Sequence, residues 1–158
     1  MDEKRAMLRH AVATVAYRGG KAIRDAPAGF ESFRAGATSR AAGEILAHVG
    51  DLFDWALTQA KGAEVWRDSS SQRWDAEVDR FFCSLAAFDA FLASGEPLGC
   101  PTERLLQGPL ADALTHIGQI AMLRRLAGSP VRGESYARAD IVVGRLGREQ
   151  SAPRREFD

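Results

Sequence analysis

The feature that most constrains this chain is the spacing of its apolar residues, which recur every three or four positions over four long segments. This spacing predicts helices over about residues 3–25, 72–93 and 102–127, and another that follows the N-cap pair Thr38 and Ser39 and runs to about residue 61. The only β-branched run, residues 141–143, is too short to build a sheet. The sequence therefore predicts an all-α protein.

Four amphipathic helices in a chain of 158 residues predict a four-helix bundle with one core. The connections are longer than an up-and-down bundle needs, so one of them is a candidate crossover. Gly108 and Pro109 interrupt the fourth segment, either as a kink within one helix or as the junction of two helices. We expect one domain over residues 1–147 and a charged tail over residues 148–158.

Charge and hydropathy narrow the function classes. Lys plus Arg and Asp plus Glu each number 21, so the net charge is zero, which disfavours nucleic acids and anionic membranes as partners. No apolar run approaches the roughly 18 residues of a membrane-spanning helix, and the first ten residues lack the apolar region that a signal peptide would have. We expect a cytoplasmic protein without a membrane segment, and its two cysteines to be reduced.

A polar stripe lies on the fourth predicted helix, where Asp112, His116 and Gln119 follow one another at spacings of four and three. The other positions of this helix are nearly all apolar or small, so we expect the stripe to point inward. Buried polar groups require partners because an unpaired one destabilises the fold. His10 has no partner at helical spacing, and we expect it on the surface.

His48 lies on the flank of the apolar stripe of the second helix, where it could face His116. With Asp112, the two imidazoles would give three ligands for a divalent metal and leave a position open, which is typical of catalytic sites. From spacing alone, each could instead be an ordinary structural residue. Gln119 would orient a ligand or substrate, or form an interhelical hydrogen bond, and Trp66 is a candidate to cover the site.

Two segments resemble the DinB/YfiT-like metalloenzyme superfamily: GEILAHVGDLFDWAL on the second helix and ADALTHIGQIAMLRRLAG on the fourth. The resemblance covers about residues 3–147. The family carries a histidine on its second helix and an HxxxHxGQ-type motif on its fourth, and these three histidines bind a divalent metal inside a four-helix bundle. His48 matches the first histidine, and His116 with the trailing Gly118 and Gln119 matches the last.

The chain departs from the family at Asp112, where the family's usual residue is histidine. The resemblance therefore implies a set of two histidines and one carboxylate, His48, Asp112 and His116. Relatives of the mycothiol-dependent maleylpyruvate isomerase type carry a carboxylate at this place, so the change is compatible with metal binding. The implied cofactor is a divalent ion, zinc or nickel first and manganese or iron as alternatives, because a carboxylate makes the site less selective.

The resemblance implies a metal-dependent enzyme acting on a small molecule, either a thiol-dependent S-transferase or isomerase or a hydrolase. The metal would activate a low-molecular-weight thiol or a water. We expect substrate to arrive where the loops after the first and third helices meet. We also expect a homodimer, because the first helix is rich in alanine and bundles of this family often pair. The alternative is a non-catalytic, dimeric binding or stress-related protein with a vestigial site.

Overall fold

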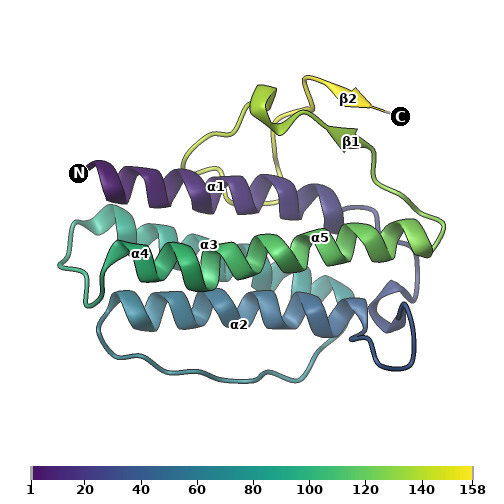
Figure 1. Cartoon of the computed structure of the whole chain (residues 1–158), viewed down its shortest axis with the longest axis horizontal. Helices are drawn as coiled ribbons and strands as arrows, with labels where there is room; N and C mark the ends of the chain where they lie inside the picture. Colours follow the sequence, from purple (N-terminus) through teal and green to yellow (C-terminus); the bar gives the residue numbers. More distant parts are fainter. Residues whose placement is uncertain (1, 158) are drawn as a thin grey trace.

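Helices make up most of the chain in the computed structural model, which describes residues 2–157 (Figure 1). The long helices are α1 (Glu3–Ile23), α2 (Ala42–Ala60), α3 (Trp74–Ser94) and α5 (Ala111–Leu126), and α5 is preceded by α4 (Thr102–Leu105) and the π-helical segment η2 (Leu106–Leu110). The short elements are the 3₁₀ turns η1 (Phe30–Ser32) and η3 (Tyr136–Arg138) and the antiparallel pair β1 (Gly133–Glu134) and β2 (Glu156–Phe157). Within the described residues there is no larger sheet, so the all-α prediction is confirmed.

The connection between α2 and α3 runs back along the full length of α2, which makes these two helices parallel (Figure 1). Near its start, the Val65 N–H donates to Thr58 Oγ1, and farther on the Ser69 N–H donates to Asp51 Oδ2 at 2.9 Å. Residues 61–73 are therefore the crossover that the connection lengths predicted.

The loops that follow α1 and α3 lie at opposite ends of the bundle, because these two helices are antiparallel (Figure 1). Arg9, near the start of α1, pairs with Asp89, near the end of α3, at 2.7 Å. The prediction that substrate arrives where these two loops meet is wrong.

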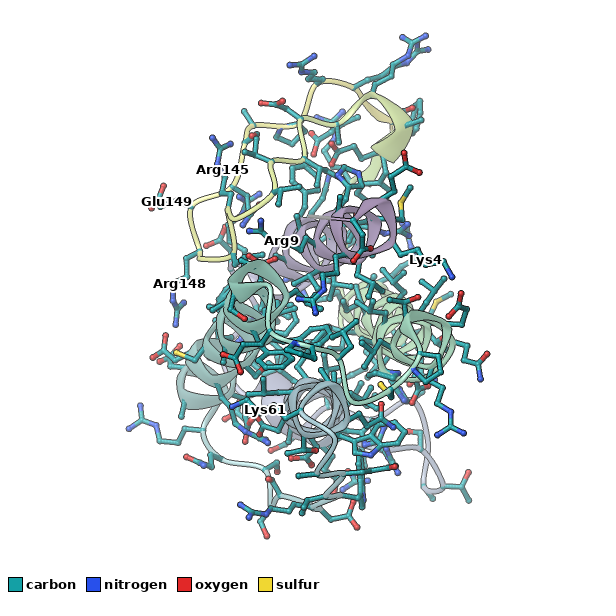
Figure 2. The ribbon with its side chains drawn as sticks, turned by 90° about the vertical axis from the view of Figure 1, so that its left-hand side faces the viewer. Lys4, Arg9, Lys61, Arg145, Arg148 and Glu149 are labelled. Atoms are coloured by element: carbon teal, nitrogen blue, oxygen red, sulfur yellow. The ribbon has the colours of Figure 1, made fainter. Side chains whose placement is uncertain are left out.

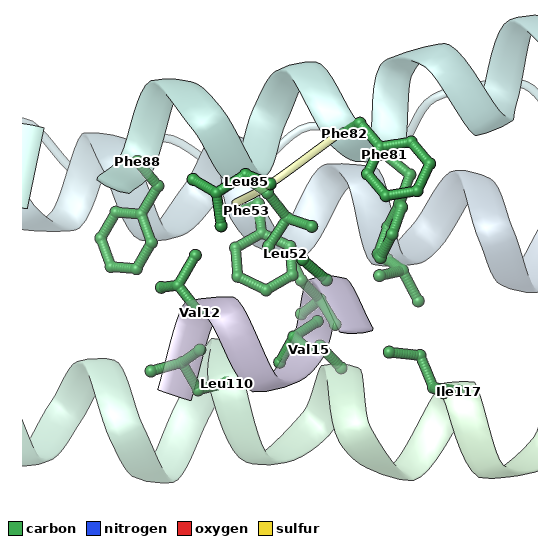
Figure 3. Close-up of a cluster of buried hydrophobic side chains, with 14 of the residues drawn as sticks. Val12, Val15, Leu52, Phe53, Phe81, Phe82, Leu85, Phe88, Leu110 and Ile117 are labelled. Atoms are coloured by element: carbon green, nitrogen blue, oxygen red, sulfur yellow. The ribbon is translucent and has the colours of Figure 1, made fainter. Parts of the chain in front are cut away.

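The core fills the axis of the bundle with aromatic and branched side chains from all four long helices (Figure 3). Phe81 and Phe88 of α3 are fully buried, as is Phe53 of α2. Gly19 of α1 faces this cluster, and a Cβ there would collide with Phe81 Cζ and lie 3.1 Å from Ile117 Cδ1. The glycine therefore permits the close approach of α1 to α3 and α5, although glycine is a poor helix former.

The first turn of α2 is capped by Glu44, and not by the predicted pair Thr38 and Ser39. The N-cap residue is Ala41, and its N–H donates to Glu44 Oε2 at 2.6 Å. This hydrogen bond and the nearby guanidinium of Arg34 hold the pKa of Glu44 below its usual value. The predicted cap is wrong because the chain stays extended through Ala41, which has φ −71° and ψ 156°.

Gly108 and Pro109 lie in η2, inside a helix that runs without a break from Thr102 to Leu126. Pro109 has no N–H, and the wider π turn accommodates the missing hydrogen bond. Of the two predicted alternatives, the structure thus shows an interruption within one helix. Because a π turn changes the helical phase, η2 sets the face on which Asp112 lies.

The segment after α5 packs back on α1 (Figure 2). Lys21 of α1 is buried and pairs with Glu134 and Glu156, each at 2.7 Å. In the predicted tail, Arg148 pairs with Asp79 of α3 at 2.7 Å. Residues from both ends of this segment therefore contact the bundle.

Within residues 2–157, no helix combines the length and the apolar character that crossing a membrane requires. Cys83 and Cys100 are free thiols, and Cys83 is exposed on α3. His10 is also exposed, as its lack of helical partners predicted.

Candidate metal centre

His48 of α2 and His116 of α5 face each other across the line where these antiparallel helices meet. Their ring centroids lie 4.6 Å apart and the rings are nearly perpendicular, at 84°. Each histidine sits at the edge of its helix's buried face, beside Ile45 and Ile117, so the side chains are only 18% and 14% exposed. The structure thus brings the two histidines together as the sequence predicted.

Asp112 completes the group from one turn before His116. Its Oδ1 lies 3.4 Å from His116 Nε2, and its Oδ2 lies 3.6 Å from His48 Nε2. The three donor atoms lie within 4.8 Å of one another. Two donors that are each about 2.1 Å from one ion at the tetrahedral angle lie about 3.4 Å apart. The group could therefore hold a divalent metal ion with only small side-chain movements.

Gln119 fixes the orientation of the His116 ring. Its Oε1 lies 2.9 Å from His116 Nδ1, and an amide oxygen can only accept a hydrogen bond. In the neutral tautomer that carries its proton on Nδ1, the ring donates to this oxygen and the lone pair of Nε2 is directed toward Asp112. Both residues belong to α5, so this contact is not the interhelical hydrogen bond that was one of the two predicted roles of Gln119.

The environment of His48 favours its neutral form. Burial is the main cause that lowers the pKa of His48, and the electrostatic effects of the nearby His116 and Arg40 lower it further, while Asp112 opposes them. A neutral imidazole is the form that coordinates metals. The lowered pKa of His48 is therefore compatible with metal coordination at neutral pH.

The polar stripe of α5 lies between two helices, as predicted, because it faces α2. It lies at the edge that α5 shares with α2, however, and not on the axis of the bundle. Gln119 is exposed and the Asp112 side chain is 47% exposed. The reason is that the neighbouring face of α5, which includes Ile117 and Ile120, already fills the core. The group is consequently accessible from solvent.

The crossover covers one side of His48. The Trp66 ring lies 5.5 Å from the ring of His48 and 5.6 Å from that of Trp55, edge-on to both. Asp51 holds this part of the crossover, because it accepts hydrogen bonds from the Ser69 N–H and from Arg80 of α3. Trp66 therefore occupies the covering position that the sequence suggested.

A cavity of about 510 Å³ opens beside the two histidines, between α2, α5 and the loop before α2. Its walls include the apolar side chains of Ile45, Met122 and Leu123, and Arg40 stands at its edge. Volumes of about 300–1,000 Å³ are usual for small-molecule sites. Sequence reasoning missed Arg40, because no periodicity places a loop residue.

A second cavity, of about 400 Å³ and largely polar, lies on the other side of His48, under the crossover. Asp51, Asp68 and Ser69 line it, and His48 and Arg40 line both cavities. His48 is thus accessible from two sides.

Comparisons of the chain with protein-family models, with curated proteins and with solved structures find no match. Within residues 2–157, the one group of three or more His, Cys, Asp and Glu donors that could hold an ion is His48, Asp112 and His116. The chemistry of the chain is therefore inferred from this geometry.

Proposed function

We propose that this chain is a divalent-metal-dependent enzyme of the DinB-like kind, with His48, Asp112 and His116 as metal ligands. The observation that carries the proposal is the convergence of three donors from two helices beside a cavity of about 510 Å³. The two segments that resemble the superfamily are the ones that meet there, and the all-α fold is compatible with it.

The protein's own residues supply most of what such a site needs. Gln119 would hold the His116 ring in the tautomer that leaves Nε2 free, since its Oε1 lies beside Nδ1. Asp112 adds a negative charge that offsets part of the charge of a divalent ion. Trp66 shields one side of His48 from water. Three protein ligands leave at least one coordination position for a water or substrate.

A divalent ion bound there supplies Lewis acidity, which lowers the pKa of a coordinated water or thiol at neutral pH. We propose a small-molecule substrate, with a low-molecular-weight thiol as co-substrate for a transferase or isomerase, or water for a hydrolase. Zinc or nickel is the proposed ion, and the carboxylate of Asp112 also suits manganese or iron.

We also propose that the protein acts as a homodimer, with the bundle over residues 1–147 as its functional unit. Part of the α1 surface is covered by the C-terminal segment, where Tyr136 packs edge-on against Tyr17 and beneath Arg18. The dimer contact is therefore expected on another helix.

A second candidate is a binding protein that uses the cavity without a metal. The apolar wall formed by Ile45, Met122 and Leu123 favours it, because such a wall binds an apolar ligand whether or not an ion is present. Metal stoichiometry separates the two candidates.

The test is a zinc titration of tag-free, chelator-treated protein against a chromophoric zinc indicator. We expect about one zinc per chain, and loss of that site in His116→Ala, because alanine keeps the helix while removing a ligand. His10→Ala is the matched control, since His10 is exposed on α1. The proposal fails if the wild-type protein binds no zinc at micromolar concentrations, or if the two variants bind equally well.

A further inference from the structure

The cavity beside the two histidines combines an apolar wall with a single charge. Ile45, Met122 and Leu123 supply apolar surface, while His48, His116 and Gln119 supply polar atoms. Arg40 is the one Lys, Arg, Asp or Glu side chain of residues 2–157 that lines this cavity. A ligand that fills the cavity therefore meets one fixed positive charge.

Arg40 is available to a ligand. Among residues 2–157 its side chain has no hydrogen-bond or ion-pair partner, whereas Arg34 on the same loop donates to the Ser39 carbonyl oxygen and to Glu44. Arg40 lies near enough to His48 for its charge to act on that imidazole. An unpaired guanidinium thus stands beside the candidate metal ligands.

The backbone on both sides of Arg40 is held in place. The Ser39 carbonyl oxygen accepts a hydrogen bond from Arg34 at 2.7 Å, and the Ala41 N–H donates to Glu44 at 2.6 Å. The direction in which Arg40 leaves the loop is therefore set before a ligand arrives. Such preorganisation lowers the entropy that binding must overcome.

We propose that Arg40 binds the anionic group of a small, largely apolar carboxylate substrate. The hydrocarbon part would pack against Ile45 and Met122, and the reacting end would reach the two histidines. A guanidinium binds a carboxylate through two parallel N–H···O bonds and does not bind a neutral amide in this way. The inference rests on the proposed function, because it takes the cavity as the place where substrate meets the metal.

The test is calorimetric titration of the zinc-loaded protein with 3-phenylpropanoate and with its neutral analogue, 3-phenylpropanamide. Arg40→Gln should weaken carboxylate binding about tenfold and leave amide binding within about twofold, because only the charged hydrogen bonds are lost. Arg40→Lys keeps the positive charge but loses the paired N–H geometry, so its carboxylate affinity should lie between those of the wild-type protein and Arg40→Gln. Arg125→Gln is the matched control, because Arg125 is an exposed arginine of α5 outside the cavity.

Three results would overturn the inference: no carboxylate binding at millimolar concentrations, equal binding of acid and amide, or equal carboxylate affinity in Arg40→Gln and Arg125→Gln. The zinc content of each sample is measured, and the titrations are repeated on metal-free protein. If the protein holds no zinc, that result counts against the proposed function. The role of Arg40 is decided separately, by whether carboxylate affinity depends on Arg40 in the zinc-loaded or the metal-free protein. Thermal melts confirm that each variant is folded.

Discussion

Replacing Gly19 by alanine tests the packing of α1 against the core. Helix propensity alone predicts that the substitution stabilises the protein, whereas the structure predicts that it destabilises the protein. Gly to Ala within a helix ordinarily stabilises a protein by about 0.5–1 kcal/mol. At Gly19, however, the new methyl group would collide with the fully buried ring of Phe81. Overpacking of this kind destabilises by about 1–3 kcal/mol.

Gly118 is the matched control, because it lies in α5 with no side chain or remote backbone within 4 Å of the position a Cβ would take. Gly118→Ala should therefore show the propensity gain alone. The difference in unfolding free energy between the two variants isolates the overpacking effect, and we expect Gly19→Ala to be less stable by about 1–3 kcal/mol. For a domain of this size, that corresponds to a difference of several degrees in melting temperature.

The assay is urea unfolding followed by circular dichroism, with a chelator present so that metal binding does not contribute. Equal stability of the two alanine variants, or a gain in Gly19→Ala over the wild-type protein, would refute the close approach of α1 to Phe81.

Further predictions concern the site, the crossover and the C-terminal segment. Gln119→Ala should weaken zinc binding at least about tenfold, measured by indicator competition, because the His116 ring loses its orienting contact. Asp51→Asn should speed proteolysis within residues 61–73 more than Asp54→Asn does, because both aspartates accept from Arg80 but only Asp51 also holds Ser69. Glu156→Gln should be less stable than wild type at neutral pH. Because pairing with Lys21 lowers the pKa of Glu156 below its ordinary 4.5, the difference should disappear in urea unfolding as pH falls through that lowered value.

The helices and the paired histidines could be predicted because both depend on spacing along single helices. The apolar period located α2 and α5, and the same period placed His48 and His116 on their edges. Glycines mark the helix ends for a local reason: Gly95 and Gly128 both adopt positive φ, which other residues rarely do.

Other features depend on contacts between distant residues, which spacing does not encode. The parallel arrangement of α2 and α3 follows from the path of the crossover, which Asp51 and Arg80 hold in place. The α5 stripe lies between helices as predicted, but not on the bundle axis, because composition shows that a helix is apolar but not which of its apolar faces enters the core. The place of Arg40 depends on a loop whose conformation is set by Glu44 capping Ala41.

The most direct test of the central claim is anomalous diffraction at the zinc edge from crystals of zinc-loaded protein. We predict one strong peak between α2 and α5, about 2.0–2.2 Å from His48 Nε2, His116 Nε2 and a carboxylate oxygen of Asp112. A zinc ion bound elsewhere with this group left empty, or an ion held by only one of the three residues, would contradict it.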